Sequence, residues 1–172
     1  LFQEKLPIHL FIISSSNSGS SLMSKYISLC ENVSKLKTEG QFVKGFVGPN
    51  PRDNNNTKHL YLETKDIYTN EKNYDFDAIK NAWYSQWDYS KPILLEKSPT
   101  SILRLAMLKK HFPNCRFLFL VRNPYALIDG IVRGNKIYDY ERAGRQAFNV
   151  LKLIMEEYKK YKDLSILIKY EE

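Results

Sequence analysis

The hydrophobic positions of this chain fall into two kinds of segment: short continuous apolar runs and longer stretches with helical spacing. The continuous runs predict strands at residues 8–13, 92–96, 115–121 and 165–170. Apolar residues three and four positions apart predict helices at residues 20–35, 75–87, 98–111, 124–133 and 140–161. Because strands and helices alternate, we expect an α/β fold in which helices flank a parallel β-sheet joined by right-handed crossovers.

Residues 37–73 are the least regular part of the chain. Glycine, proline and asparagine interrupt them, and only residues 42–47 and 59–62 are candidates for short extended segments. One interpretation is substrate contact or a lid, since long irregular segments in compact domains are often functional. A surface insertion is the other, and the pattern does not choose between them. The aromatic residues that follow either line an acceptor site for a sugar or phenol or pack in the core: Trp83, Tyr84, Trp87 and Tyr89.

Composition narrows the class of protein. The chain has 172 residues, 43% of them hydrophobic, which is enough for a single domain over residues 1–172 with its own core. A net charge of +7 and a pI near 9.3 favour anionic partners. The lysines are spread along the chain, which argues against a nucleic-acid-binding tail. No apolar run is long enough to span a membrane.

The cysteines and the chain ends bear on the compartment. Cys30 and Cys115 are too few for a metal site or a disulfide framework, and both lie in apolar segments, so we expect buried thiols. Reduced thiols favour a cytoplasmic location. The chain starts at Leu1 and stops just after a predicted strand, so we expect it to be incomplete at the C-terminus. A missing N-terminal anchor would instead permit the lumen of the secretory pathway.

A serine-rich loop joins the first predicted strand to the first predicted helix. Six serines lie within residues 14–21, together with Asn17 and Gly19. The first backbone N–H groups of a helix lack internal partners and carry partial positive charge, so such a loop suits an anion. A simple helix cap is the alternative, but one or two serines would suffice for that. The Gly-Lys-[Ser/Thr] of ATP-binding loops is absent, because Ser20 follows Gly19.

Polar groups also follow two other predicted strands. Glu96 and Lys97 come at the end of the second, and Arg122 comes at the end of the third. Ligands of open parallel sheets bind at the carboxyl ends of the strands, so we expect these groups and the serine loop to share one edge. Arg122 presents a planar fork of donors that suits a phosphate group. Glu96 is a candidate general base, or it forms a structural ion pair with Lys97 or caps the next helix.

These motifs together resemble those of sulfotransferases that use 3′-phosphoadenosine 5′-phosphosulfate (PAPS). Residues 14–22 resemble the family's 5′-phosphosulfate loop, and residues 117–124, ending in Val-Arg-Asn-Pro, resemble its 3′-phosphate signature. Glu-Lys-Ser-Pro at 96–99 is similar to an element of bacterial-type members, and residues 168–171 resemble a strand ending in Arg-Tyr-Glu. The resemblance covers residues 8–172 in order and implies a P-loop-like sulfotransferase fold.

The resemblance also implies roles for individual residues. The donor would be bound by Ser16, Asn17, Ser18, Gly19, Ser20 and Ser21 at its 5′-phosphosulfate and by Arg122 and Gly130 near its 3′-phosphate. Catalysis would fall to Glu96, Lys97 and Asn17, with Glu96 as the base. The reaction would move a sulfuryl group to a hydroxyl or amine of a small molecule or glycan. No metal and no nucleic acid would be needed.

Two positions depart from the family pattern. Asn17 stands where the loop usually has Lys or Arg, and Gly130 stands where a serine is usual. Lys97 or Arg133 are candidates to supply the missing charge. These departures keep open a non-catalytic nucleotide-binding module. A small-molecule kinase is a further alternative, because kinases share the strand–loop–helix opening.

Overall fold

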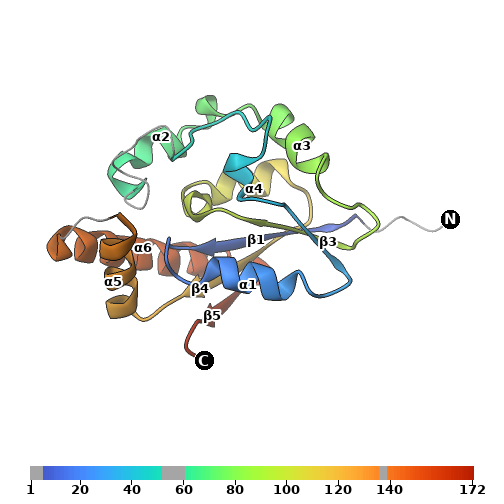
Figure 1. Ribbon diagram of the computed structural model, residues 1–172. Coiled ribbons are helices and arrows are strands. Elements are labelled where there is room, and N and C mark those ends of the chain that lie inside the picture. The colour runs from blue at the N-terminus through green and yellow to red at the C-terminus, as the bar shows by residue number, and fades with distance from the viewer. Residues whose placement is uncertain (1–5, 52–60, 136–138) are drawn as a thin grey trace.

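The computed structural model describes residues 6–51, 61–135 and 139–172, which contain a five-stranded sheet (Figure 1). Its order is β2-β3-β1-β4-β5, and every neighbouring pair is parallel. The strands are β1 (Ile8–Ser14), β2 (Val33–Lys35), β3 (Ile93–Lys97), β4 (Cys115–Val121) and β5 (Ser165–Lys169). The α-helices are α1 (Ser20–Ile27), α2 (Lys65–Thr69), α3 (Phe76–Tyr84), α4 (Leu105–His111), α5 (Pro124–Asn135) and α6 (Tyr140–Lys160). The predicted parallel α/β sheet is therefore confirmed.

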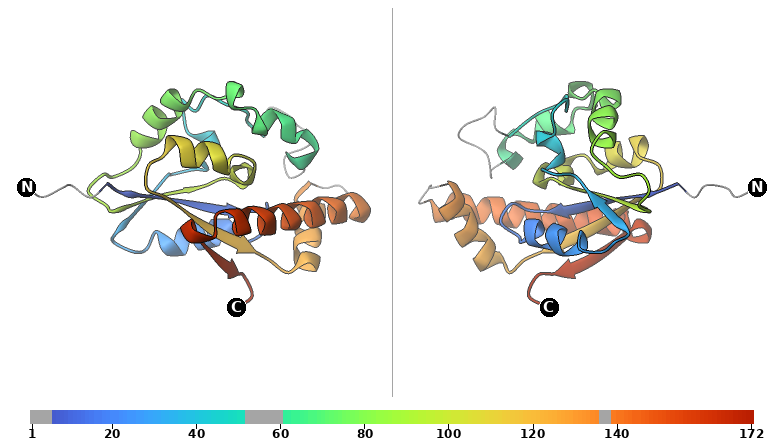
Figure 2. Two further views of the ribbon diagram at one scale, coloured as in Figure 1. Left: turned by 180° about the vertical axis from the view of Figure 1, so that it is seen from behind. Right: turned by 45° about the vertical axis from the view of Figure 1, so that its right-hand side comes forward.

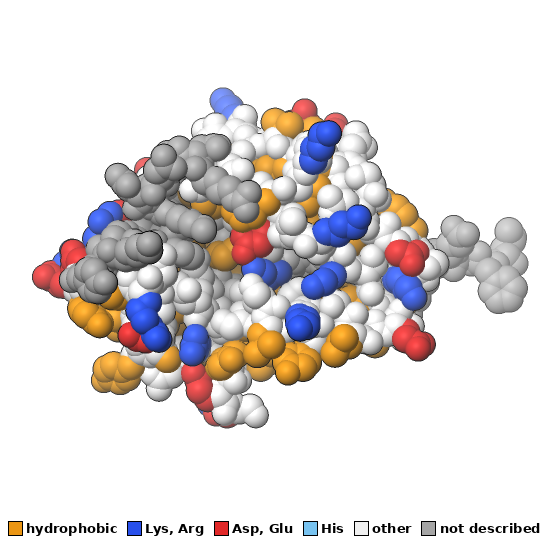
Figure 3. All heavy atoms as spheres, in the orientation of Figure 1, with side chains coloured by type: hydrophobic (Ala, Val, Ile, Leu, Met, Phe, Trp, Pro, Cys, Tyr) orange, Lys and Arg blue, Asp and Glu red, His pale blue; other side chains and the backbone are white. Residues whose placement is uncertain are grey.

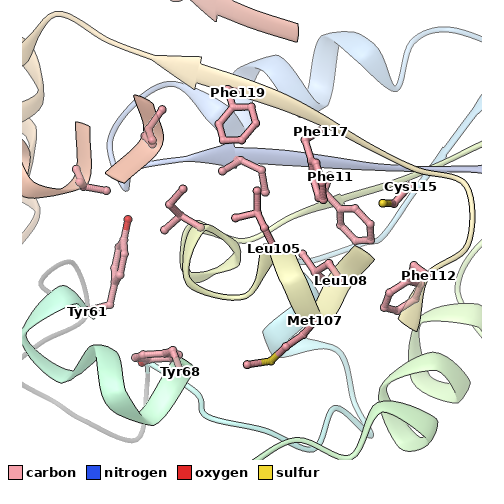
Figure 4. Packing of buried hydrophobic residues seen from close by; sticks show 14 of the residues in the cluster. Phe11, Tyr61, Tyr68, Leu105, Met107, Leu108, Phe112, Cys115, Phe117 and Phe119 are labelled. Carbon is pink, nitrogen blue, oxygen red and sulfur yellow. The ribbon is translucent and has the colours of Figure 1, made fainter. Parts of the chain in front are cut away.

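The central strands form because their side chains are covered on both faces. Phe11, Phe117 and Phe119 belong to the larger core cluster, which also contains residues of α3, α4 and α6. Figure 4 shows these three rings on the side of the sheet that faces α4. Ile12 and Leu118 alternate with them and belong to a smaller cluster on the opposite face, against α1. The left view of Figure 2 brings α6 in front of the sheet, on the face opposite α1.

The first helix is shorter than predicted. It ends at Ile27 rather than near residue 35, and Val33–Lys35 form β2, a strand that the sequence pattern missed. Non-local pairing decides this, because β2 is held in parallel register against β3. Leu29, one of the apolar residues that suggested a longer helix, is 72% exposed. Cys30 is exposed as well, so its predicted burial is wrong, whereas Cys115 is buried.

The described parts of the irregular segment, residues 37–51 and 61–73, contain short helical turns. These are η1 (Gly40–Phe42), η2 (Tyr61–Thr64) and η3 (Glu71–Asn73), with α2 between the last two. The predicted extended segment at residues 42–47 is therefore wrong. In the predicted segment at 59–62, residues 59 and 60 lie outside the described residues, and the rest begins η2. A further turn, η5 (Lys162–Leu164), precedes β5.

Two other expectations are refined. The helix predicted from residue 98 is a 3₁₀ helix, η4 (Pro99–Leu103), followed by α4, and the Ser98 side chain makes no cap hydrogen bond. Trp83 and Trp87 are buried in the larger core cluster, as core packing predicts, and are unavailable to an acceptor. Within the described ranges, no helix combines the length and the apolar character needed to cross a bilayer.

Candidate functional site

The serine loop turns sharply between β1 and α1. Asn17 has φ 63° and Gly19, the residue before α1, has φ 88°. Glycine suits position 19 because this φ is positive, and a Cβ there would also lie 2.2 Å from the Tyr170 ring. The first turn of α1 contains no acidic residue. The loop therefore presents backbone amides at a helix N-terminus without a competing carboxylate on that helix.

Most of the loop borders one cavity of about 530 Å³. Its wall includes Ser16, Asn17, Gly19, Ser20 and Ser21. Among the described residues, the buried Nδ2 of Asn17 has no hydrogen-bond partner. A buried amide donor without a partner is costly, so this atom suits a ligand acceptor.

Ser18 lies differently from the other loop residues. It is buried, is not part of the cavity wall, and its Oγ donates to the backbone oxygen of Ser15 at 2.6 Å. The Ser18 hydroxyl therefore stabilises the loop, and only the backbone of Ser18 is available for the donor binding predicted for this residue.

Arg122 lies at the end of β4, where its side chain reaches the serine loop. One terminal nitrogen donates to the backbone oxygen of Asn17 at 2.8 Å, and the guanidinium lies 5.0 Å from the centre of the Tyr170 ring. Its buried Nε has no hydrogen-bond partner among the described residues. Arg122 also borders the cavity. It is thus oriented by the loop and by an aromatic ring while keeping donor capacity for an anion.

Lys97 brings a positive charge to the other side of the loop. The register of β1 with β3 pairs Lys97 with Ile12, so its side chain emerges beside the loop that follows β1. Its Nζ donates to Ser21 Oγ at 3.1 Å and lies 2.5 Å from Glu39 Oε1. The side chain is only 10% exposed. The ammonium group therefore faces the cavity at the start of α1, which Asn17 leaves without a lysine or arginine.

Glu96 does not border this cavity. It is 1% exposed, its Oε1 accepts from the backbone N–H of Gly40 at 3.1 Å, and it also accepts from the hydroxyls of Ser98 and Ser101. We call Glu96, Ser98, Ser101 and Arg104 the Glu96 cluster. Burial raises the pKa of Glu96, opposed mainly by the nearby charge of Arg104. The geometry favours a structural role over the catalytic one predicted for Glu96.

The Glu96 cluster holds the start of the irregular segment in place. Gly40 is bound by Glu96 at its N–H, and its carbonyl accepts from Trp83 Nε1 at 2.9 Å. A Cβ at Gly40 would lie 2.6 Å from the Trp83 ring. These contacts fix the backbone between Glu39 and Gln41. Glu96 therefore positions two cavity residues.

Sequence reasoning missed one wall of the cavity, which includes Glu39, Gln41 and Thr100. Glu39 accepts from Lys97 and from Gln41 Nε2, the latter at 2.9 Å, and Gln41 in turn accepts from Thr100. All three newly found residues border the cavity, as does Tyr61. Burial raises the pKa of the Tyr61 hydroxyl. No local motif marks these positions. Glu39, Gln41 and Tyr61 come from residues 37–73, which favours the substrate-contact interpretation of that segment.

The two departures from the family pattern meet in space. A Cβ at Gly130 of α5 would lie 2.9 Å from the Cβ of Asn17. Gly130 therefore lets α5 approach the loop closely, and it borders the cavity. Arg133 pairs with Asp129 on the same helix and is not part of the cavity wall, so Lys97 is the better placed of the two candidate charges.

Solved structures support the fold. A sulfotransferase from Alicyclobacillus acidocaldarius is 16% identical with a TM-score of 0.58, covering 94% of this chain and 72% of that one. The sulfotransferase domain of the Synechococcus PCC 7002 olefin synthase is 18% identical with a TM-score of 0.58, covering 98% and 68%. A gluconokinase from Sinorhizobium meliloti 1021 is 12% identical with a TM-score of 0.51, covering 96% and 84%. These likenesses show a fold that sulfotransferases share with P-loop kinases.

The comparison that identifies the chain is at the level of sequence families. No curated protein matches the chain significantly. The model of the sulfotransferase family, in contrast, matches residues 7–165 and so spans both the serine loop and Arg122. This chain belongs to the sulfotransferase family.

Proposed function

We propose that the chain transfers a sulfuryl group from PAPS to a hydroxyl or amine of an acceptor. The observation that carries this proposal is the single cavity bordered by the serine loop, Arg122 and Lys97. Its volume of about 530 Å³ lies within the range of about 300–1,000 Å³ that small-molecule sites occupy. The donor atoms without partners, Asn17 Nδ2 and Arg122 Nε, fit an anionic ligand.

On this proposal, the donor is held at two places. The backbone amides at Gly19, Ser20 and Ser21 and the hydroxyls of the last two hold the 5′-phosphosulfate. Arg122 holds the 3′-phosphate through charge-assisted hydrogen bonds. Asn17 contributes an amide donor without charge, and Gly130 leaves room for the loop. Ser16 completes the wall on the β1 side.

Lys97 and Glu39 divide the chemistry of transfer. Bound PAPS supplies an activated sulfuryl group: the bond from sulfur to the acceptor oxygen or nitrogen forms as the bond from sulfur to the phosphate oxygen breaks, releasing adenosine 3′,5′-bisphosphate. Lys97 and the loop amides stabilise the negative charge that develops on the departing oxygen. Glu39 accepts the acceptor's proton, because its carboxylate borders the cavity whereas that of Glu96 does not.

A non-catalytic nucleotide-binding protein is the second candidate. The observation that favours it is the pair Asn17 and Gly130, which removes a charge and a hydroxyl from the family pattern. Such a protein would bind adenosine 3′,5′-bisphosphate without turning PAPS over. The acceptor of a transferase is a small molecule or glycan. The free thiols Cys30 and Cys115 fit a cytoplasmic location for either candidate.

Binding and turnover separate these candidates. Calorimetry should show that adenosine 3′,5′-bisphosphate binds and that ATP competes poorly, whereas tighter binding of ATP than of the bisphosphate would refute the proposal and favour a kinase. Release of the bisphosphate from PAPS in the presence of acceptor mixtures should then be lost in Glu39→Gln and in Lys97→Met, with binding retained. Glu31→Gln, at an exposed glutamate of the α1–β2 connection, is the matched control. Binding without turnover would establish the second candidate.

A further inference from the structure

A second, smaller depression adjoins the cavity. It measures about 230 Å³ and shares Ser21, Glu39 and Lys97 with the larger cavity. The rest of its wall comes from α1, β2 and the chain after β2, together with one residue of β3: Ser24, Lys35, Leu36, Lys37, Thr38 and Leu95. The depression thus opens onto the place where Lys97 meets the serine loop.

The sheet brings the lysines of this depression together. Parallel pairing sets Lys35 opposite Leu95, and the N–H of Leu36 continues the ladder to the Leu95 oxygen at 3.1 Å. Lys37 lies two residues after Lys35, as Lys97 lies two residues after Leu95, and all four residues border the depression. Because successive side chains of an extended segment alternate, burial of Leu36 turns both Lys35 and Lys37 outward, and both are exposed. Three lysines therefore converge at the carboxyl ends of β2 and β3.

The positive charge of this depression is not balanced. Glu39, the one acidic residue in the described part of its wall, is already paired with Lys97. Neither Lys35 nor Lys37 forms a side-chain hydrogen bond or ion pair with any residue that the structure describes. Lys110, in contrast, is paired with Glu71. Figure 3 shows Lys and Arg side chains gathered over the region of α1 and β3 on this face.

We propose that Lys35, Lys37 and Lys97 form a subsite for an anionic group of the acceptor, a carboxylate or a sulfate or phosphate ester close to the group that is sulfated. This inference rests on the proposed function, because Lys97 and Ser21 join the subsite to the place assigned to the transferred sulfuryl group. The phosphates of PAPS are assigned to the serine loop and Arg122. Lys35 and Lys37 are therefore available to bind an anionic group of the acceptor. Acidic acceptors are then preferred over neutral ones.

The test uses the protein saturated with adenosine 3′,5′-bisphosphate, titrated with sodium sulfate or sodium acetate against sodium chloride of equal ionic strength. We expect saturable amide chemical-shift changes at Leu36, Thr38 and Lys97. The double variant Lys35→Gln/Lys37→Gln should weaken this binding about two- to thirtyfold. The control Lys152→Gln/Lys159→Gln removes the same charge from exposed positions on α6 and should leave it unchanged.

The outcomes are distinct. Stronger binding of sulfate than acetate indicates a sulfated or phosphorylated acceptor, and comparable binding indicates a carboxylated one. Changes that do not saturate, or that persist in Lys35→Gln/Lys37→Gln, overturn the subsite while the bound bisphosphate leaves the proposed function intact. Failure of the bisphosphate itself to bind overturns the proposed function, and the subsite with it.

Discussion

Two groups of polar residues lie beside the cavity, and they differ in how the hydrogen bonds of their buried atoms are satisfied. In the Glu96 cluster, the carboxylate accepts from Gly40, Ser98 and Ser101. On the opposite side, Asn17 Nδ2 and Arg122 Nε find no partner among the described residues. We call Asn17, Ser20, Ser21 and Arg122 the donor cluster.

The Glu96 cluster has one buried atom without a hydrogen bond, Nε of Arg104, whose guanidinium lies over the rings of Phe46 and Tyr74. Arg104 is thus packed within the protein, whereas Arg122 faces the cavity. This difference shows that the role of a polar residue at a strand end cannot be inferred until its hydrogen-bond partners are known. Satisfied groups hold the fold, and groups left without partners at a cavity bind ligands.

The largest effect is expected from breaking the Glu96 cluster. Glu96→Ala leaves Gly40, Ser98 and Ser101 with unpaired buried donors, so the free energy of unfolding should fall by about 3–5 kcal/mol. Urea denaturation followed by circular dichroism measures this. Glu31→Ala, at an exposed position, should leave the unfolding midpoint unchanged. An equally stable Glu96→Ala protein would mean that the cluster is not structural.

The donor cluster should respond in affinity rather than stability. Arg122→Ala removes charge-assisted hydrogen bonds to a phosphate, so binding of adenosine 3′,5′-bisphosphate should weaken by about 1.5–3 kcal/mol, tenfold to hundredfold. Calorimetry compares it with Arg116→Ala, an exposed arginine near the opposite end of the same strand. Equal losses in the two variants would contradict a specific role for Arg122.

A smaller effect tests the close approach of α5 to the loop. Gly130→Ser places a Cβ against Asn17, so we expect a loss of about 1–2 kcal/mol in unfolding free energy. Asn17→Gly removes the opposing side chain and suits the positive φ at that position. The double variant should therefore recover most of the loss, as a thermal or urea double-mutant cycle would reveal. Simple additivity of the two changes would argue against the contact.

The pH dependence of stability sharpens the comparison further. Burial raises the pKa of Glu96 above 4.5, so the unfolded state ionises this carboxyl before the folded state does. Its contribution to stability is then present below pH 4.5 and is lost as the pH rises through the raised pKa. Glu96→Gln cannot titrate, so wild type should lose stability relative to Glu96→Gln between acidic and neutral pH. Urea midpoints of both proteins across this interval provide the measurement, and a constant difference would show that Glu96 does not titrate there.

Local patterns in the sequence determined much of this protein. The apolar runs at β1 and β4 and the helical spacing of α5 and α6 predict elements that the structure confirms. The serine loop, Lys97 and Arg122 could be predicted to meet, because the carboxyl ends of parallel strands share an edge. Such information lies within a few consecutive residues and in the order of the elements along the chain. It sufficed for the fold class and for bringing the serine loop, Lys97 and Arg122 to one edge of the sheet.

Only the tertiary structure decided the rest. β2 forms because it pairs with β3, and no local pattern in Val33–Lys35 predicts that pairing. Glu96 and Glu39 have different surroundings because they contact different residues far away in the chain. The Glu96 carboxylate is buried and accepts a hydrogen bond from the Gly40 amide, whereas the Glu39 carboxylate lies at the cavity beside Lys97. The sequence alone assigned the chemistry to Glu96, since a glutamate at a strand end resembles a site residue. Burial and hydrogen-bond partners decide what a carboxylate does, and both are set by residues far apart in the chain.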